Sequence, residues 1–350
     1  LLPRAIIEED PYAIQALIVL GASLQTAWPN PGLWQRALEK LDFLVSIDLQ
    51  LTRDAAYADL VLPATTGFEQ NSYCYYGNAI RYRERLIPPV GQAKPSYEIL
   101  VELADRLGYG HLYPRHTEAL LQYILSASDY TLDDLMKAER HVLRMPSAPI
   151  QYRKWELGLM RADGQPGFET PSGKFEIAST VLADHGYDPL PVYQESDETP
   201  VSSPDLTRRF PLILGTGPFK PDMKSCLRAI PSFIERFPHP CVEIHPTDAA
   251  SRGIVEGDLA IIKTVRGKVS MRAKVTDRIM EGFVYAPVGG GGPQGPEAWR
   301  QANVNLLTDD QQYDEISGFP VYKTLLCQVK KKKRIRRGAA SADPSLGCGG

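Results

Sequence analysis

Two short loops carry residue types that suit nucleotide binding. The first is Gly21-Ala22-Ser23, where small side chains let a ligand approach the backbone closely. The second runs from Asp48 to Thr52. A carboxylate at a strand end accepts two hydrogen bonds from a guanine edge or a ribose diol, and a threonine hydroxyl donates to a phosphate. The same residues also fit a turn at Asp48 and a helix cap at Thr52, and Gly21 belongs to no G-x-G-x-x-G motif.

The apolar runs before these loops predict a parallel sheet. Residues 16–21, 43–47 and 60–62 read as buried strands, and residues 33–41 and 52–57 between them have helical signals. Apolar strands that alternate with helices are typical of an α/β Rossmann-like domain whose parallel sheet is covered on both faces. A further helix is predicted at 96–107, where Gly108 supplies the stop.

The rest of the chain divides by composition. Helices are predicted at 117–126 and 131–140, and prolines then mark an irregular connector over about 145–200, which closes the first domain, 1–200. Short β-rich runs separated by turn residues follow over 205–330, which favours a compact β-barrel. The predicted strands are 212–215, 242–244, 259–264, 268–275, 283–286 and 324–329. Residues 331–350 read as a basic, glycine-rich, disordered tail.

Composition excludes several classes of protein. The net charge of -3 gives no general preference for nucleic acid, so no nucleic-acid partner is expected. No apolar run reaches the roughly 18 to 20 residues of a membrane helix. The chain opens on Leu1 without a signal-like segment, so we expect a sequence entered partway through, and its compartment is undetermined.

Other tempting groups favour plainer interpretations. The five cysteines show no close pair of the kind that zinc or iron–sulfur sites use, and the six histidines form no H-E-x-x-H motif. The glycines at 289–292 read as a flexible loop at the barrel rim, since a phosphate cradle would need a helix directly behind it. Asp309, Asp310 and Asp314 favour a solvated acidic face over a calcium site.

Residues 48–64 carry a long and specific resemblance. Their sequence, D-L-Q-L-T-R-D-A-A-Y-A-D-L-V-L-P-A, is similar to the D-x-x-x-T-x-T-A-x-x-A-D-x-V-L-P-A signature of molybdopterin oxidoreductases of the dimethyl-sulfoxide-reductase family. In that family this α/β domain binds the guanosine end of one of two pterin-guanine dinucleotides. The resemblance therefore implies cofactor contacts from Gly21, Ser23, Asp48 and Thr52.

A second block resembles the family's carboxyl-terminal dinucleotide-binding domain, a six-stranded double-psi β-barrel. It comprises L-G-T-G at 214–217, K-S-C-L-R at 224–228 and V-E-I-H-P-T-D-A at 242–249. The resemblance implies backbone contacts from Thr216, Gly217 and Ser225. Nearer the end, Asn305 could read the amide edge of the pterin, and Lys323 could neutralise a phosphate.

The implied cofactor is molybdopterin guanine dinucleotide, two per complete enzyme, with molybdenum or tungsten. The metal ligand and a 4Fe-4S cluster are expected only in an N-terminal part that this chain lacks, so no catalytic or metal-binding residue is assigned and no turnover is expected from the chain alone. That N-terminal part is one expected partner. An iron–sulfur electron-transfer subunit and a membrane-anchor subunit are the others.

The implied activity is two-electron oxidation or reduction of a small substrate. Residues 168–176 and 186–191 look like polysulfide and thiosulfate reductase relatives, while formate and arsenic-oxyanion chemistry stay open. The alternative is a non-catalytic cofactor-binding or interaction subunit built on the same two domains.

Overall fold

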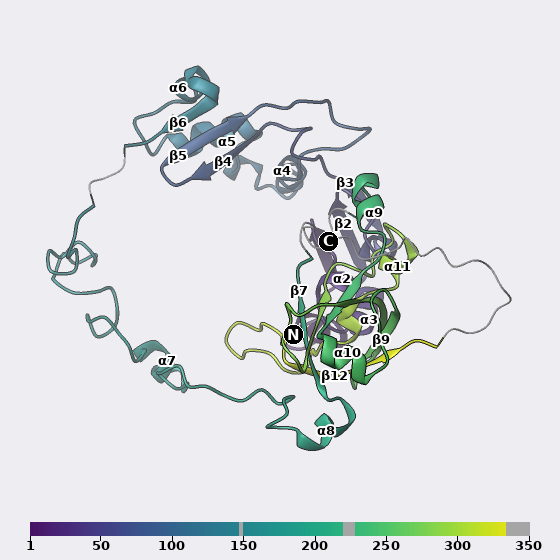
Figure 1. Ribbon diagram of the computed structural model, residues 1–350. Helices are drawn as coiled ribbons and strands as arrows, with labels where there is room; N and C mark the ends of the chain where they lie inside the picture. Colours follow the sequence, from purple (N-terminus) through teal and green to yellow (C-terminus); the bar gives the residue numbers. More distant parts are fainter. Residues whose placement is uncertain (147–149, 220–227, 334–350) are drawn as a thin grey trace. The chain divides into compact units, whose positions relative to one another are not determined.

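The computed structural model describes residues 1–146, 150–219 and 228–333 (Figure 1). They form two compact units, each described separately below. The first comprises Leu1–Gln70, Arg85–Arg115 and Ser196–Gly350, and the second comprises Asn71–Glu84 and His116–Glu195. Most of the predicted tail, 334–350, lies outside the described residues, and the predicted domain boundaries at 200 and 205 stay predictions.

The first unit begins with a three-stranded parallel sheet in the order β1-β2-β3. Asn30 caps helix α3 by accepting a hydrogen bond from the Leu33 amide, and Pro31 occupies the first helical position. Leu38 of α3 packs on Val19 and Leu44 of the sheet. The elements are α1 (Leu2–Glu8), β1 (Ala16–Leu20), α2 (Leu24–Ala27), α3 (Pro31–Lys40), β2 (Phe43–Asp48), η1 (Asp54–Tyr57), β3 (Leu60–Pro63), α4 (Ser96–Arg106) and η2 (Gly110–Leu112).

One face of this sheet is more open than the sequence predicted. In the parallel register, Ile18 lies beside Val45, and Val45 lies beside Leu60. Val45 is buried, whereas Ile18 and Leu60 are 44% and 43% exposed. The prediction of a sheet covered on both faces is therefore wrong for the outer strands.

The first unit also contains a closed barrel with the strand order β10-β8-β11-β7-β12-β9. Two pairs, β8 with β10 and β7 with β11, are parallel, and antiparallel pairs close the circle. Alternate side chains point inward and make the largest core of the molecule. The elements are α8 (Pro204–Arg209), β7 (Leu212–Gly217), α9 (Pro231–Arg236), β8 (Cys241–Ile244), α10 (Pro246–Ser251), β9 (Leu259–Lys263), β10 (Lys268–Val275), β11 (Phe283–Pro287), α11 (Glu297–Arg300), η4 (Val304–Leu306) and β12 (Leu325–Lys331).

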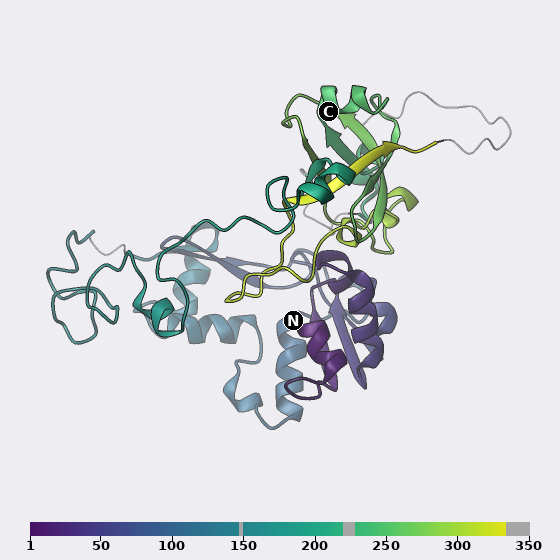
Figure 2. The same ribbon diagram turned by 90° about the horizontal axis from the view of Figure 1, so that it is seen from below.

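The predicted fold class is confirmed: a parallel-sheet α/β domain is followed by a six-stranded β-barrel of the double-psi type. Figure 2 shows the sheet and its helices in purple and the barrel in green to yellow. No helix among the described residues combines the length and the apolar character that crossing a membrane requires.

The second unit pairs three antiparallel strands, β4-β5-β6, with two helices. Ile80 and Tyr82 of β5 pack on Leu121, Leu125 and Leu135. The sequence predicted both helices, but the second ends earlier than expected because Ala138 leaves the helical backbone conformation. The hairpin of β4 and β5 was not predicted. The elements are β4 (Ser72–Tyr76), β5 (Ala79–Arg83), α5 (Thr117–Leu125), α6 (Leu132–Lys137), η3 (Glu139–His141), β6 (Val142–Arg144) and α7 (Thr180–Asp184).

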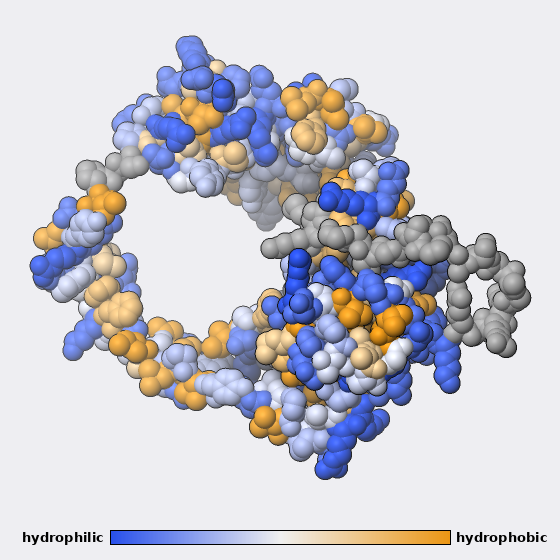
Figure 3. All heavy atoms as spheres, viewed as in Figure 1, coloured by the Kyte–Doolittle hydropathy of each residue, from blue (hydrophilic) through white to orange (hydrophobic). Residues whose placement is uncertain are grey.

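Residues 150–195 of the second unit are turns and irregular chain around the short helix α7. Hydrophobic side chains gather along this stretch (Figure 3). Phe175, Ile177 and Tyr193 are 72%, 78% and 82% exposed. Within the stretch, Trp155 stacks on Phe168 at 6.1 Å between ring centroids, which gives it local order without a core.

Glu198, Arg266 and Asp309 form an ion-pair triad that ties the segment before α8 to the barrel. The Arg266 guanidinium donates to both carboxylates, which are almost completely buried. The predicted solvated acidic face is therefore wrong for Asp309 and Asp310, whereas Asp314 is exposed. Asp309 is 2% exposed and paired, and Asp310 pairs with Arg4 at 2.7 Å.

We expect Arg266→Leu to destabilise the protein by about 3 kcal/mol, because it leaves two buried carboxylates without their cation. Urea denaturation followed by circular dichroism measures this. The matched control is Arg208→Leu, which removes an exposed pair with Asp205 and should change the free energy of unfolding by less than about 0.5 kcal/mol. Equal effects of the two substitutions would contradict the structural role of the triad.

Glu118 is the hydrogen-bond centre of the second unit. Its Oε1 accepts hydrogen bonds from Tyr82 Oη and Asn71 Nδ2, both at 2.6 Å, and Oε2 lies 3.1 Å from His116 Nδ1. Burial opposes ionisation, but the hydrogen bonds outweigh it and lower the pKa of Glu118 below its usual value. The ionised carboxylate therefore stabilises this unit above the pKa of the unfolded chain, and that contribution is lost as the pH falls through the folded pKa.

We expect acidification from about pH 6 to about pH 3 to cost the second unit more stability in the parent chain than in Glu118→Gln. Amide hydrogen exchange of α5 and β5, read by mass spectrometry, reports on this unit directly. Glu139→Gln is the control, since the Glu139 side chain is 91% exposed. Loss of protection with identical pH dependence in all three proteins would contradict the assignment.

Candidate functional site

A cavity of about 120 Å³ lies between the two predicted loops of the sheet and the rim of the barrel. It brings together four residues singled out from sequence: Gly21, Ser23, Asp48 and Thr52. A larger depression of about 720 Å³ shares Thr52, Arg53 and part of the barrel rim with it. The carboxyl ends of neighbouring parallel strands thus face an enclosed space, as ligand sites of open α/β sheets do.

Asp48 ends β2 with its carboxylate oriented by the backbone. Its Oδ1 accepts hydrogen bonds from the amides of Leu49 at 2.7 Å and Gln50 at 3.4 Å. Oδ2 accepts none from the residues that the structure describes. Burial raises the pKa of Asp48, and the two amide bonds only partly offset this. The turn and the ligand-binding interpretations are therefore compatible, because each uses a different oxygen.

The Thr52 hydroxyl likewise keeps its proton available for a ligand. Its Oγ1 accepts a hydrogen bond from the Ala55 amide at 3.3 Å, close to the predicted capping role. A hydroxyl that accepts through a lone pair still has its proton to donate. Thr52 lines both the inner cavity and the larger depression, so that proton is in reach of a ligand in either.

The Gly21–Ser23 loop is held from beneath by Asp54. This carboxylate is 1% exposed and accepts from the amides of Leu24 at 2.5 Å and Gln25 at 3.1 Å. Burial raises the pKa of Asp54, against the effect of these bonds. Gly21 has a φ of +56°, which favours glycine, and a Cβ there would meet open space. The Ser23 hydroxyl is buried, and it is one of the hydrogen-bonding groups that lower the pKa of Asp54.

The barrel contributes its glycine run to the cavity, which the sequence analysis missed. Gly289, Gly291 and Gly292 line it together with Pro293 and Gln294. The run is packed against its neighbours: the Gly291 amide donates to Trp299 O at 2.9 Å, and the φ of Gly291 is +99°. The signal was available in the four consecutive glycines, which permit close backbone packing as well as flexibility.

A second overlooked group is Arg228 with Trp299. The guanidinium carbon lies 3.3 Å from the centroid of the indole ring, and both residues line the cavity. The indole Nε1 donates to Phe237 O at 2.9 Å, which fixes the ring. Arg53 adds another cationic side chain to the lining. Two guanidiniums at one cavity favour an anionic ligand, and a stacked guanidinium is held in place for it.

Thr216 and Gly217 end β7 at the same rim. The carbonyl of Gly217 accepts from the Val288 amide, directly before Gly289. The Thr216 hydroxyl donates to Tyr322 O at 2.8 Å, so its proton is used and its lone pairs remain as acceptors. Neither residue lines the cavity itself.

The remaining predicted residues are not brought to this cavity. Asn305 is 1% exposed: its Nδ2 donates to Thr26 O at 2.8 Å, and its Oδ1 accepts from the Thr308 hydroxyl. Lys323 is exposed and does not line the cavity. Ser225 lies outside the described residues. Cofactor roles for these three residues stay predictions.

Bonds between distant segments join the two sides of the cavity. Asn303 Nδ2 donates to Gln25 O at 2.8 Å, parallel to the bond from Asn305 to Thr26. The Gln294 side-chain amide donates to Leu51 O and so ties the glycine loop to the Asp48 loop. No group of three or more His, Cys, Asp or Glu side chains within the described ranges could hold a metal ion.

Comparison with known proteins gives two matches to family models. Residues 5–106 match the molybdopterin oxidoreductase model, and residues 212–326 match the molydopterin dinucleotide binding domain model. The first range contains the loops at Gly21 and Asp48, and the second contains the glycine run.

Relatives of known name match over most of this chain. The probable oxidoreductase YyaE of Bacillus subtilis is 31% identical over 330 residues, which cover 91% of this chain and 45% of the relative. Dimethyl sulfoxide reductase DmsA of Escherichia coli is 30% identical, covering 84% of this chain and 38% of the relative. The solved structure of acetylene hydratase from Pelobacter acetylenicus matches with a TM-score of 0.81 and 26% identity, over 95% of this chain and 46% of that one. The chain thus spans less than half the length of these relatives.

We expect Gly291→Ala to lower the free energy of unfolding by about 2 kcal/mol or more, because the left-handed backbone conformation is strained and the added methyl group overpacks the rim. The new Cβ would lie 2.5 Å from Asn303 Cβ. Gly67→Ala is the control, since its Cβ meets nothing within 4 Å and its φ is ordinary. Thermal denaturation of both variants measures this effect. Equal midpoints would contradict the tight packing of the loop around Gly291.

Proposed function

Because the chain belongs to the molybdopterin oxidoreductase family, we propose that it is the carboxyl-terminal, cofactor-binding portion of a molybdenum or tungsten enzyme. When bound, the pterin-held metal ion supplies two-electron redox chemistry. The residues of this chain bind the organic part of the cofactor, orient it and exclude water from it. We propose two pterin-guanine dinucleotides per complete enzyme. The metal ligand and a 4Fe-4S cluster would then belong to the remaining part of the enzyme.

One observation carries the proposal: Gly21, Ser23, Asp48 and Thr52, far apart in sequence, line one cavity. Asp48 Oδ2 is suited to accept hydrogen bonds from the N–H groups of a guanine edge, while Oδ1 is held by the backbone. Ser23 lines the same cavity and lies beside the Asp54 carboxylate. These features fit the guanosine end of the cofactor.

The positive charges at the cavity also support the binding of the cofactor's nucleotide part here. Arg53 and Arg228 line the cavity, and the Thr52 hydroxyl faces both it and the adjoining depression. A diphosphate between a guanosine and a pterin would gain charge-assisted hydrogen bonds from such groups. The inner cavity, at about 120 Å³, suits only part of the nucleotide, and the depression of about 720 Å³ offers room for the remainder.

For the complete enzyme we propose two-electron redox of a small substrate. Residues 168–176 and 186–191 favour a polysulfide or thiosulfate type, with formate and an arsenic oxyanion as alternatives. Its proposed partners are an iron–sulfur electron-transfer subunit and a membrane-anchor subunit. The rival proposal is a non-catalytic cofactor-binding or interaction subunit. Mass spectrometry of the full-length native protein separates the two, because the enzyme must contain guanine and molybdenum or tungsten, whereas the rival needs no metal.

We expect the chain to bind guanosine diphosphate in preference to adenosine diphosphate, because an adenine edge offers no matching pair of donors to a carboxylate. Asp48→Asn should weaken guanosine diphosphate binding about tenfold or more, since hydrogen bonds to a charged acceptor are lost. Isothermal titration calorimetry measures both effects. The exposed Asp42 provides the control variant Asp42→Asn. Equal affinity for guanosine diphosphate and adenosine diphosphate would contradict the guanosine assignment.

A further inference from the structure

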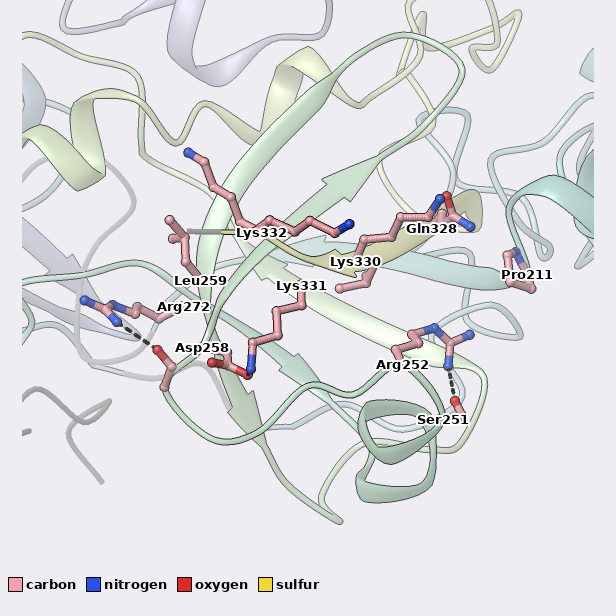
Figure 4. Close-up of a pocket in the computed structure, with 13 residues that line it drawn as sticks. Pro211, Ser251, Arg252, Asp258, Leu259, Arg272, Gln328, Lys330, Lys331 and Lys332 are labelled. Carbon is pink, nitrogen blue, oxygen red and sulfur yellow. Dashed lines mark hydrogen bonds and ion pairs between the residues drawn. The ribbon is translucent and has the colours of Figure 1, made fainter. Parts of the chain in front are cut away.

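A second large hollow lies on the outside of the barrel, remote in its lining from the cavity described above. It is a groove of about 1290 Å³ in which the end of β12 meets the loop before β9 (Figure 4). Six basic side chains line it, and we call it the basic groove. They are Arg252, Arg272, Lys330, Lys331, Lys332 and Lys333.

Within the described part of the lining, one carboxylate, Asp258, accompanies these six cations. It is already engaged, because Lys331 Nζ lies 2.7 Å from its Oδ2 and the Val255 amide donates to the same oxygen at 2.9 Å. Hydrogen bonds from these groups outweigh burial and lower the pKa of Asp258, so it stays ionised. Arg272 also attracts this carboxylate, and Arg252 pairs with Asp248 outside the lining. Among the described residues, Lys330, Lys332 and Lys333 are therefore the cations of the groove that have no carboxylate partner.

The arginines are held in place by the barrel. Arg272 Nη1 donates to Gly257 O at 2.8 Å, and Arg252 Nη1 donates to Asp248 O at 2.8 Å and lies 3.0 Å from Asp248 Oδ1. Each guanidinium retains further N–H groups for a ligand, since it has five in total. The lysines are exposed, and the backbone beneath them is fixed by the bond from the Lys332 amide to Leu259 O at 2.8 Å.

The shape and composition of the lining select the kind of partner. A groove of this size has room for an extended peptide. A flat membrane surface would instead contact charges that protrude from the protein, not charges that line a groove. Among the residues that the structure describes, no aromatic side chain lines the groove, so this lining offers no platform on which bases of single-stranded nucleic acid could stack. Pro211, Leu259 and Val329 add apolar surface between the charges, which suits the side-chain stems of a peptide.

We propose that the basic groove binds an extended acidic segment of a partner protein. This partner site is separate from the proposed cofactor site, and binding there does not depend on that assignment. Electrostatic complementarity of this kind steers association and selects partners by charge, so its strength falls with added salt.

The test uses the full chain and a fluorescein-labelled peptide of alternating glutamate and alanine, followed by fluorescence anisotropy. We expect saturable binding that weakens when salt rises from about 0.1 M to about 1 M, because the Debye length shortens from about 10 Å to about 3 Å. The variant Lys330→Glu/Lys332→Glu/Lys333→Glu keeps the Lys331–Asp258 pair and should bind about tenfold more weakly or worse.

The control variant Lys154→Glu/Lys263→Glu/Lys268→Glu makes the same change in net charge at exposed lysines outside the groove. It should bind the peptide like the parent chain, and both variants should keep the parent circular dichroism spectrum. The proposal is overturned if both variants weaken binding equally or if the acidic peptide does not bind at about 0.1 M salt. Tighter groove-dependent binding of a single-stranded oligonucleotide, or of vesicles rich in phosphatidylserine, would overturn it in favour of that partner.

Discussion

The candidate site depends on the pair of amides that fasten the barrel to the sheet. Asn303 and Asn305 donate to two successive carbonyls at the end of α2, and all four residues are buried. Each bond contributes only about 1 kcal/mol, but losing one leaves a buried carbonyl without a partner. Together with the bond from Gln294 to Leu51, this junction holds the loops after β1 and β2 against the glycine run of the barrel, so that they line one cavity.

The local pattern of apolar runs and turn residues was sufficient to predict much of the fold and the part of the candidate site that the sheet contributes. The runs ending at Gly21 and Asp48 read as buried strands, and parallel strands bring their carboxyl ends to one edge, so the two loops had to approach each other. The six strands of the barrel also followed from short β-rich runs between turns. In these places the sequence of each segment predicts its secondary structure without information on distant residues.

What could not be predicted depends on contacts across long stretches of chain. The bond from Asn303 to Gln25 spans 278 residues, so nothing near position 303 indicates a structural amide. The glycine run resembles any flexible loop until Trp299 and Asn303 are known to pack against it. Asp309 reads as a surface residue because its cation, Arg266, lies 43 positions away. The β4–β5 hairpin was overlooked although Gly77-Asn78 is a typical turn pair.

The position of β12 in the barrel has a consequence for biosynthesis. This strand pairs with both β7 and β9, yet it follows them by dozens of residues in the chain. A ribosome therefore releases the other five strands before the ring can close, and two unpaired strand edges face the cytosol or a chaperone in the meantime. Open edges of this kind recruit other chains.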